Sequence, residues 1–177
     1  VYNAFVHART GVGRWVFDTF SSEPVLLQTV NPAVRAKVAT NLLRDYGMFR
    51  ARVSHEIVPQ KNPKKAKVAY RIDAGEQFCL DSIEYGHFPG MQDTLIHRHW
   101  QERLPRRGEA FSVVNLELER QRLTELFRNH GYYYYRTDYI TFQADTVRNP
   151  GKVWLKILPQ AGLPAVVNKR WHVGNAT

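Results

Sequence analysis

The sequence predicts an α+β fold made of two tandem copies of one small unit. Two sequence matches and a shared order of elements support this prediction. Residues 43–49 align with residues 127–133 at an offset of 84, and residues 67–72 align with residues 152–157 at an offset of 85. Two matches at nearly one offset are typical of an internal repeat. In each copy a helical pattern is followed by two strand patterns, which indicates a mixed unit rather than an all-helical or all-strand one.

The helix of the first copy is expected to begin at Asn31 and Pro32. Asparagine is a favoured N-cap residue, and proline suits the first helical turn. Apolar residues then recur at helical spacing up to Gly47, which fits the left-handed position that ends many helices. In the second copy the sequence predicts Asn115 as the cap and Gly131 as the residue that ends the helix.

Each helix is followed by a predicted pair of strands joined by a polar loop. A polar loop that contains proline or glycine between two apolar segments is typical of a hairpin. The first strands are expected over residues 51–58 and 133–142, and the returning strands over residues 67–72 and 153–158.

The second copy also shows what precedes its helix. Residues 78–85 have a strand pattern, and a short helix is expected over residues 94–103 with Asp93 as its cap. The second unit therefore has the order β-α-α-β-β. In the first unit, residues 1–30 are expected to supply the matching strand and first helix, with 12–20 as a helical candidate. We predict domains over residues 1–75 and 76–160, with 161–177 as a linker or the start of a truncated third unit.

Composition and charge limit the classes of protein. The chain has 177 residues, of which 44% are hydrophobic and 23% charged, as in ordinary globular proteins. No stretch approaches the ~18–20 apolar residues that a membrane-spanning helix needs. The single cysteine, Cys79, excludes an intramolecular disulfide and any cysteine-based zinc motif. The formal net charge of +9 favours anionic partners.

No catalytic or metal-binding motif is present. The P-loop, G-x-S-x-G and H-E-x-x-H patterns are all missing. His97 and His99 are two residues apart on a predicted helix, so they face different directions and do not form a chelate. The sequence therefore predicts no enzymatic activity, no metal site and no cofactor.

Two groups of residues have competing interpretations. The carboxylates Glu117 and Glu119 lie beside arginines on a helix, which favours a solvated charged face over an acid–base pair. The segment 132–135 contains four tyrosines, which is compatible with a platform that stacks nucleic-acid bases. The structural interpretation is that one pair of tyrosines packs under the helices and the other pair lies on the surface.

The order of elements, with glycine and aromatic residues at the end of the second helix, resembles that of POTRA (polypeptide-transport-associated) domains in the BamA/TamA superfamily of outer-membrane assembly proteins. The resemblance covers residues 23–159 and is greatest for the TamA-like proteins of Bacteroidetes known as TamL. The segments that carry it are residues 42–53, 68–75, 80–85, 118–123, 129–133 and 145–146.

The resemblance implies a three-stranded mixed sheet in each unit, covered on one face by two helices. It also implies a periplasmic region of a larger outer-membrane protein. The expected partners are unfolded outer-membrane client polypeptides and a TamB-like protein that spans the periplasm. Nucleic acid is not an expected partner, and membrane contact would come only through a barrel or a lipid anchor outside this chain.

By analogy with the family, the predicted binding elements are the strands after the glycine–aromatic turns. An exposed strand edge can accept an extended peptide as an additional strand. The candidate edge residues are Arg50, Ala51, Arg52, Val53, His55, Ile57, Arg136, Thr137, Asp138, Tyr139, Ile140 and Gln143.

Two clusters of basic residues are candidates for a partner-facing patch, since loop cations attract acidic partners or anionic lipid head groups. They are Lys61, Lys64 and Lys65 in the first hairpin loop, and Arg103, Arg106 and Arg107 in the link between helices. Two further hypotheses stay open at this stage. The chain could be a basic nucleic-acid-binding module, or a rigid spacer that docks an inner-membrane partner.

Overall fold

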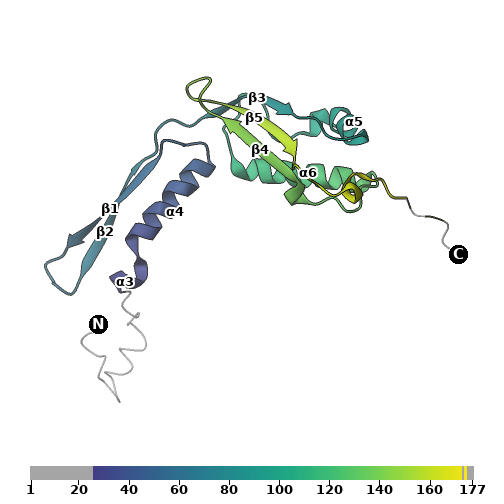
Figure 1. Ribbon diagram of the computed structural model, residues 1–177. Helices are drawn as coiled ribbons and strands as arrows, with labels where there is room; N and C mark the ends of the chain where they lie inside the picture. The colour runs from purple at the N-terminus through teal and green to yellow at the C-terminus, as the bar shows by residue number, and fades with distance from the viewer. Residues whose placement is uncertain (1–25, 173, 175–177) are drawn as a thin grey trace, which may run out of the picture. The chain divides into compact units, whose positions relative to one another are not determined.

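The computed structural model describes residues 26–172 and residue 174, which divide into two compact units (Figure 1). The described part of the N-terminal unit comprises residues 26–39 and 53–71, and the C-terminal unit comprises residues 40–52 and those from 72 onwards. The end of the first long helix therefore belongs to the C-terminal unit. Each unit is described by itself below.

The N-terminal unit contains helix α3 (Leu27–Val30), the first part of α4 (Pro32–Asp45) and most of a two-stranded sheet formed by β1 (Arg52–Pro59) and β2 (Ala66–Asp73). The predicted start of α4 is confirmed, because the Val34 N–H donates to Asn31 Oδ1 at 3.4 Å and Pro32 is the first helical residue. The other elements expected from residues 1–30, including the helix at 12–20, fall outside the described residues apart from α3.

The C-terminal unit has the predicted order β-α-α-β-β. Its main elements are β3 (Cys79–Tyr85), α5 (Met91–Arg98), α6 (Val113–Asn129), β4 (Ile140–Asp145) and β5 (Lys152–Pro159), with short 3-10 turns at Trp100–Glu102, Thr137–Tyr139 and Ala165–Asn168. The strands form a sheet in the order β3-β5-β4, with β3 parallel and β4 antiparallel to β5. The expected α+β class and mixed three-stranded sheet are confirmed in this unit.

The core lies between one face of the sheet and the two helices. Along β5 the side chains of Val153, Leu155 and Ile157 are fully buried, whereas the alternate residues are partly exposed. This alternation is the pattern of a strand with one packed face. Phe127 from α6 is also fully buried and contacts the Tyr135 ring at 4.8 Å between centroids.

Three predicted boundaries are wrong, each for a local reason. The N-cap of α6 is Ser112, whose Oγ accepts the Asn115 N–H at 3.4 Å, so Asn115 lies inside the first turn. Helix α5 begins at Met91 after Gly90, so Asp93 lies within the first turn rather than at the cap. The strand after α6 begins at Ile140 rather than at residue 133.

The segment before β4 forms a turn because of two backbone hydrogen bonds, one to the end of α6 and one within the segment. The Tyr132 N–H donates to Phe127 O and the Tyr135 N–H donates to Tyr132 O, both at 3.0 Å. Tyr132 and Tyr135 are 2% and 1% exposed, whereas Tyr133 and Tyr134 are 65% and 48% exposed. One pair of tyrosines is buried and the other is exposed, as expected, but a strand would bury alternate residues. The buried pair is instead the first and last of the four, because the segment is a turn.

Replacing Tyr135 by phenylalanine is expected to raise the free energy of unfolding by about 1 kcal/mol at neutral pH, because the buried hydroxyl has no hydrogen-bond partner among the described residues. Burial also raises the pKa of Tyr135 above its ordinary value of 10.0. The unfolded chain therefore ionises first, and the stability contributed by the neutral form is present below pH 10.0 and is lost as the pH rises toward the folded pKa.

Urea unfolding of the wild type and the variant from pH 8 to pH 11 would test this prediction. The variant should lack the part of the alkaline stability loss that comes from this residue. Tyr133→Phe is the matched control, because that hydroxyl lies on a side chain that is 65% exposed. A Tyr135→Phe variant less stable than the wild type would contradict the prediction.

Candidate functional site: the free edge of the C-terminal sheet

Strand β4 has one paired side and one free side. Its register with β5 runs without interruption from Ile140 opposite Pro159 to Asp145 opposite Trp154. No other described strand pairs with β4, because β3 lies on the far side of β5. In Figure 1, β4 forms the outer border of the sheet.

The register decides which backbone groups face outward. The Gln160 N–H donates to Tyr139 O at 2.8 Å, which places residue 139 in a hydrogen-bonding position opposite the strand that continues from β5. Because such positions alternate along an antiparallel pair, the N–H and C=O groups of Ile140, Phe142 and Ala144 point away from β5. The Ile140 N–H already donates to Thr137 O. An extended peptide beside β4 would therefore find the Ile140 carbonyl and the N–H and C=O groups of Phe142 and Ala144 available for pairing.

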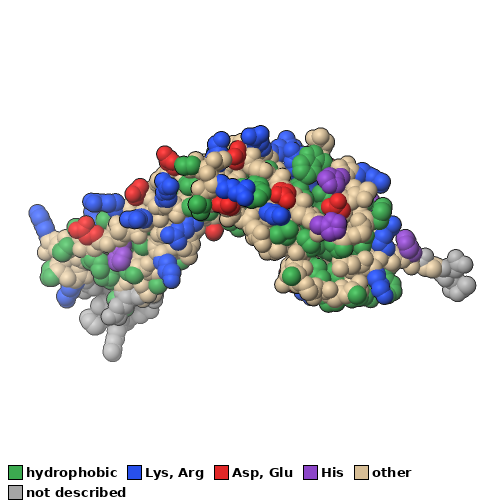
Figure 2. Space-filling view, turned by 45° about the horizontal axis from the view of Figure 1, so that its top comes forward, with side chains coloured by type: hydrophobic (Ala, Val, Ile, Leu, Met, Phe, Trp, Pro, Cys, Tyr) green, Lys and Arg blue, Asp and Glu red, His purple; other side chains and the backbone are tan. Residues whose placement is uncertain are grey.

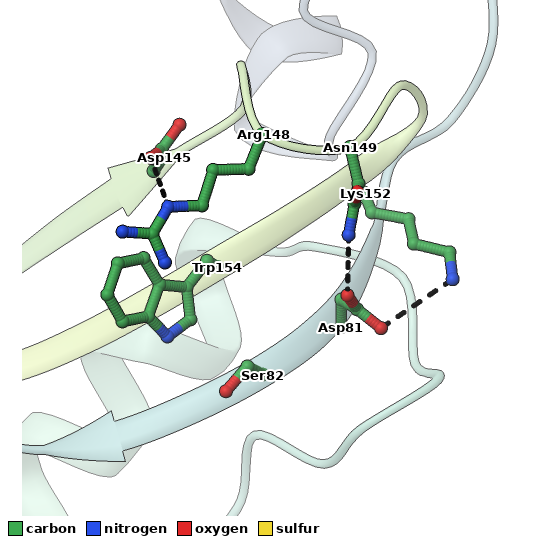
Figure 3. A pocket seen from close by; sticks show the side chains of 7 residues that line it. All are labelled: Asp81, Ser82, Asp145, Arg148, Asn149, Lys152 and Trp154. Carbon is green, nitrogen blue, oxygen red and sulfur yellow. Dashed lines mark hydrogen bonds and ion pairs between the residues drawn. The ribbon is translucent and has the colours of Figure 1, made fainter.

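The open face of the sheet carries a polar cluster next to the end of this edge. We call it the Trp154 cluster, and Figure 3 shows it. Cross-strand partners share a face, so Asp145, Trp154 and Ser82 form one row across all three strands. The cluster borders a hollow of ≈ 340 Å³ and consists of Asp81, Ser82, Asp145, Arg148, Asn149, Lys152 and Trp154.

Arg148 connects the β4–β5 loop to the open face. Its guanidinium carbon lies 3.6 Å from the centroid of the Trp154 ring, and its Nε lies 3.4 Å from Asp145 Oδ2. In Figure 3 the side chain extends from the loop over the indole. The stacked cation and the ion pair hold this loop against the sheet at the end of β4.

Asp81 gathers a second set of polar groups at a β-bulge. The register between β3 and β5 shifts between Leu80 and Ser82, so Asp81 is the extra residue. Its carboxylate accepts a hydrogen bond from Asn149 at 3.0 Å and lies 3.6 Å from the Lys152 ammonium. The Asn149 hydrogen bond is the main cause that lowers the pKa of Asp81, and attraction to Lys152 adds to it against the opposing effect of burial.

The charged groups of the Trp154 cluster are paired with one another. The cluster has carboxylates and cations in equal number, and it contains no cysteine or histidine. Within the described part of the chain no group of three or more His, Cys, Asp and Glu side chains could hold a metal ion. The cluster can contact a polar peptide side chain, and it braces the loop beside the edge.

The other side of the unit is held by a buried ionic network around Glu119. This side chain is fully buried, and it accepts hydrogen bonds from Tyr85 Oη at 2.6 Å, from the Leu104 N–H at 3.0 Å and from Arg122 Nη2 at 2.6 Å. Burial disfavours the charge of Arg122, but the hydrogen bond and attraction of Glu119 outweigh it and raise the pKa of Arg122. Burial, followed by the Glu119 charge, raises the pKa of Tyr85.

The prediction of a solvated charged face is therefore half wrong. Glu117 is exposed and pairs with Arg120 at 2.8 Å, as expected for a surface ion pair. Glu119 instead joins α6 to the end of β3 and to the link before α6. The sequence signal that could have indicated this is weak, since both glutamates have an arginine three residues later.

The predicted edge residues near residue 140 are only partly in a strand. Ile140 and Gln143 belong to β4, but the candidates at 136–139 precede it. Thr137–Tyr139 form a 3-10 turn, and Arg136 pairs with Asp138 at 3.4 Å. The last two residues of β4, Ala144 and Asp145, lie beyond the predicted edge strand.

The predicted edge residues near residue 52 are divided in the same way. Arg52, Val53, His55 and Ile57 lie in β1, which has one described partner strand, β2. The two residues before β1 belong to the C-terminal unit, where Ala51 is fully buried and the Arg50 guanidinium lies 5.8 Å from the Phe78 ring centroid. Arg50 and Ala51 are therefore not strand residues.

The two basic clusters differ in their environment. Lys61, Lys64 and Lys65 are exposed in the β1–β2 loop. Arg103 instead stacks on Trp100 at 4.4 Å and donates to the Trp100 carbonyl, and Arg107 lies 3.4 Å from Asp81. On the face shown in Figure 2, lysine and arginine side chains are interspersed with acidic and apolar ones.

Comparison with known proteins finds matches among solved structures. No protein-family profile and no curated protein sequence matches the chain. The BamA of Haemophilus ducreyi lacking POTRA domains 1-3 is 15% identical over 90% of this chain and 26% of that chain, with a TM-score of 0.52. The POTRA3-5 segment of Haemophilus influenzae BamA is 13% identical over 83% of this chain and 54% of that one, with a TM-score of 0.45.

The likeness at these identities concerns the fold, and the Haemophilus ducreyi structure carries it. The β-α-α-β-β unit defines a small α+β domain with a sheet covered on one face by two helices. The Haemophilus ducreyi structure is a BamA that lacks POTRA domains 1-3. The chain spans about half of the length of one BamA structure and about a quarter of the other. In the described residues no helix combines the length and apolarity needed to cross a membrane.

Proposed function

We propose that this chain is a periplasmic POTRA region of an outer-membrane protein in the BamA/TamA superfamily, and that β4 binds extended client polypeptides by strand addition. The observation that carries the proposal is the free edge of β4, where three residues direct backbone groups away from β5. Backbone pairing tolerates many sequences, which suits a binder of varied unfolded polypeptides.

The finer assignment rests on the sequence resemblance to TamL. It supports a TamB-like periplasmic partner for the whole protein and a role in outer-membrane assembly or translocation. The described residues offer no catalytic motif to support an enzymatic function. The exposed cations of the β1–β2 loop are candidates for contact with such a partner.

Fluorescence anisotropy with a labelled peptide from an outer-membrane strand would test the proposal. We expect weak binding, with a dissociation constant of about 0.1–1 mM, because one strand of contact must offset the lost freedom of the peptide. Binding should persist at moderate salt. A peptide N-methylated at every second residue, on the side that faces β4, should not bind, whereas the same peptide methylated on the other residues should.

Ala144→Pro is the matching protein variant. Ala144 is exposed and its N–H points away from β5, so proline removes a donor from the free edge without removing a bond of the sheet. We expect at least a tenfold loss of peptide affinity, about 1.4 kcal/mol. Ala144→Thr retains the N–H and should bind like the wild type. Equal binding by Ala144→Pro, with an unchanged circular dichroism spectrum, would contradict strand addition at β4.

The two alternatives predict different outcomes in the same assay. A nucleic-acid-binding module would bind a short DNA with a steep salt dependence and would not bind the peptide. A spacer would bind neither probe. The mixed charges on the face in Figure 2 favour the peptide binder over the nucleic-acid module.

A further inference from the structure

The turn after α6 repeats the turn after α4 bond for bond. The Met48 N–H donates to Leu43 O at 3.0 Å, and the Tyr132 N–H donates to Phe127 O at 3.0 Å. The glycine at each helix end has a positive φ, 84° at Gly47 and 95° at Gly131. The two turns therefore present the same backbone shape, at the offset of 84 found in the sequence.

A second chain segment is held against each of these glycines in the same way. The Phe78 N–H donates to Gly47 O at 3.0 Å, and the Trp171 N–H donates to Gly131 O at 2.7 Å. A Cβ built on Gly47 would lie 3.1 Å from Phe78 O, and one built on Gly131 would lie 2.9 Å from Trp171 O. Only glycine accommodates such a close approach.

The residues that precede Phe78 and Trp171 also make the same hydrogen bond. Gln77 Nε2 donates to the carbonyl one residue before Gly47 at 3.0 Å, and Arg170 Nε donates to the carbonyl one residue before Gly131 at 3.0 Å. Residues 170 and 171 thus occupy the places of residues 77 and 78. Their offset is 93 rather than 84, so a sequence comparison at the repeat spacing does not find them.

The segment that follows Phe78 indicates what would follow Trp171. Phe78 directly precedes β3, the first strand of a β-α-α-β-β unit. In that arrangement Phe49 is covered, with its ring centroid 5.2 Å from Phe78 and 5.0 Å from Phe111. Tyr133 is the counterpart of Phe49 and is 65% exposed. Trp171 takes the backbone place of Phe78, but the centroid of its ring lies 5.6 Å from that of Tyr134. The counterpart of Phe111 is what the surface lacks among the described residues.

We propose that Tyr133, Tyr134 and Trp171 form a docking surface for a further β-α-α-β-β unit whose first strand follows Trp171 in the longer polypeptide. An apolar side chain of that unit, in the place of Phe111, covers Tyr133. The occupant is a continuation of the chain and not a client peptide, because the segment at 170–171 already has the contacts of a segment that leads into a first strand. This inference is independent of strand addition at β4.

The charges around this surface indicate which side chains the docking unit would carry at the edge of the contact. A hollow of ≈ 490 Å³ beside Tyr133 is bordered by Arg128, Arg170, His130 and His172, and no carboxylate lines it. An apolar side chain surrounded by Asp or Glu side chains would complement this surface. The two exposed tyrosines and the tryptophan supply rigid apolar area for the contact.

Thiol labelling of the full-length native polypeptide would test the proposal. In a Cys79→Ala background, Tyr133→Cys places a single thiol on the proposed surface, and Val147→Cys places one on the β4–β5 loop, where the side chain is 88% exposed. We expect maleimide to label residue 133 at least about tenfold more slowly than residue 147, at a rate that does not change on tenfold dilution.

A second variant separates docking from other causes of protection. Trp171→Ala in the Tyr133→Cys background should restore labelling to the rate of the Val147→Cys protein, because the ring that continues the surface is removed. Equal labelling of residues 133 and 147 in the native polypeptide would overturn the proposal. Protection that disappears on dilution would overturn it too, since the occupant would then be a second copy or a separate partner.

Discussion

The Glu119→Ala variant is expected to lose about 3–5 kcal/mol of the free energy of unfolding, the largest effect of any single side-chain truncation considered for this chain. The carboxylate is fully buried and takes part in four hydrogen bonds, two of them with Arg122. Its removal leaves the Arg122 guanidinium, which is 16% exposed, without its counter-charge. It also leaves the Tyr85 hydroxyl and the Leu104 N–H without an acceptor.

Two variants give this prediction its controls. Glu117→Ala removes an exposed carboxylate on the same helix that also pairs with an arginine, and should cost about 0–1 kcal/mol. Glu119→Gln keeps the volume and one acceptor for the Leu104 N–H, and should fall between the two. Urea unfolding followed by tryptophan fluorescence would measure all three. If Glu119→Ala and Glu117→Ala were equally stable, the buried network would not be a major stabilising feature.

These two glutamates show why the buried position of Glu119 could not be predicted from the sequence. Both are on α6 and both have an arginine three residues later, so the local pattern is the same for each. The difference comes from the rotation of α6 against the sheet, which turns Glu119 toward Tyr85 at the end of β3. That contact spans 34 positions in the sequence and depends on tertiary packing, which local patterns do not determine.

The features that the sequence did predict are local ones. The cap at Asn31, the left-handed Gly47 and Gly131, and the order of helix and strands each depend on residues close together in the chain. The tyrosines at 132–135 have high strand propensity, but the bond from the Tyr132 N–H to Phe127 O and the bond from the Tyr135 N–H to Tyr132 O hold them in a turn. The binding edge itself needed the strand order β3-β5-β4, which depends on a parallel pairing between distant segments.

Gly47→Ala is the second change with a large expected effect. The residue has φ +84°, a conformation that costs an alanine about 1–2 kcal/mol. The new Cβ would also lie 3.0 Å from Phe111 O and 3.1 Å from Phe78 O, both of which are backbone atoms. Backbone atoms of two chain segments cannot move aside as the end of a flexible side chain can. We therefore expect the Gly47→Ala variant to lose about 3–4 kcal/mol in the free energy of unfolding in total.

Gly108→Ala separates the two causes of this loss. Gly108 has φ +89°, but a Cβ there would meet nothing within 4 Å. Its alanine variant should therefore show only the conformational cost of about 1–2 kcal/mol. The difference between the two variants measures how tightly the end of α4 is held against the segments at Phe78 and Phe111. Equal losses of stability would mean that the segments at Phe78 and Phe111 can move away from residue 47 at no measurable free-energy cost. The segment at Trp171, which approaches Gly131 in the same way, would then be equally easy to move.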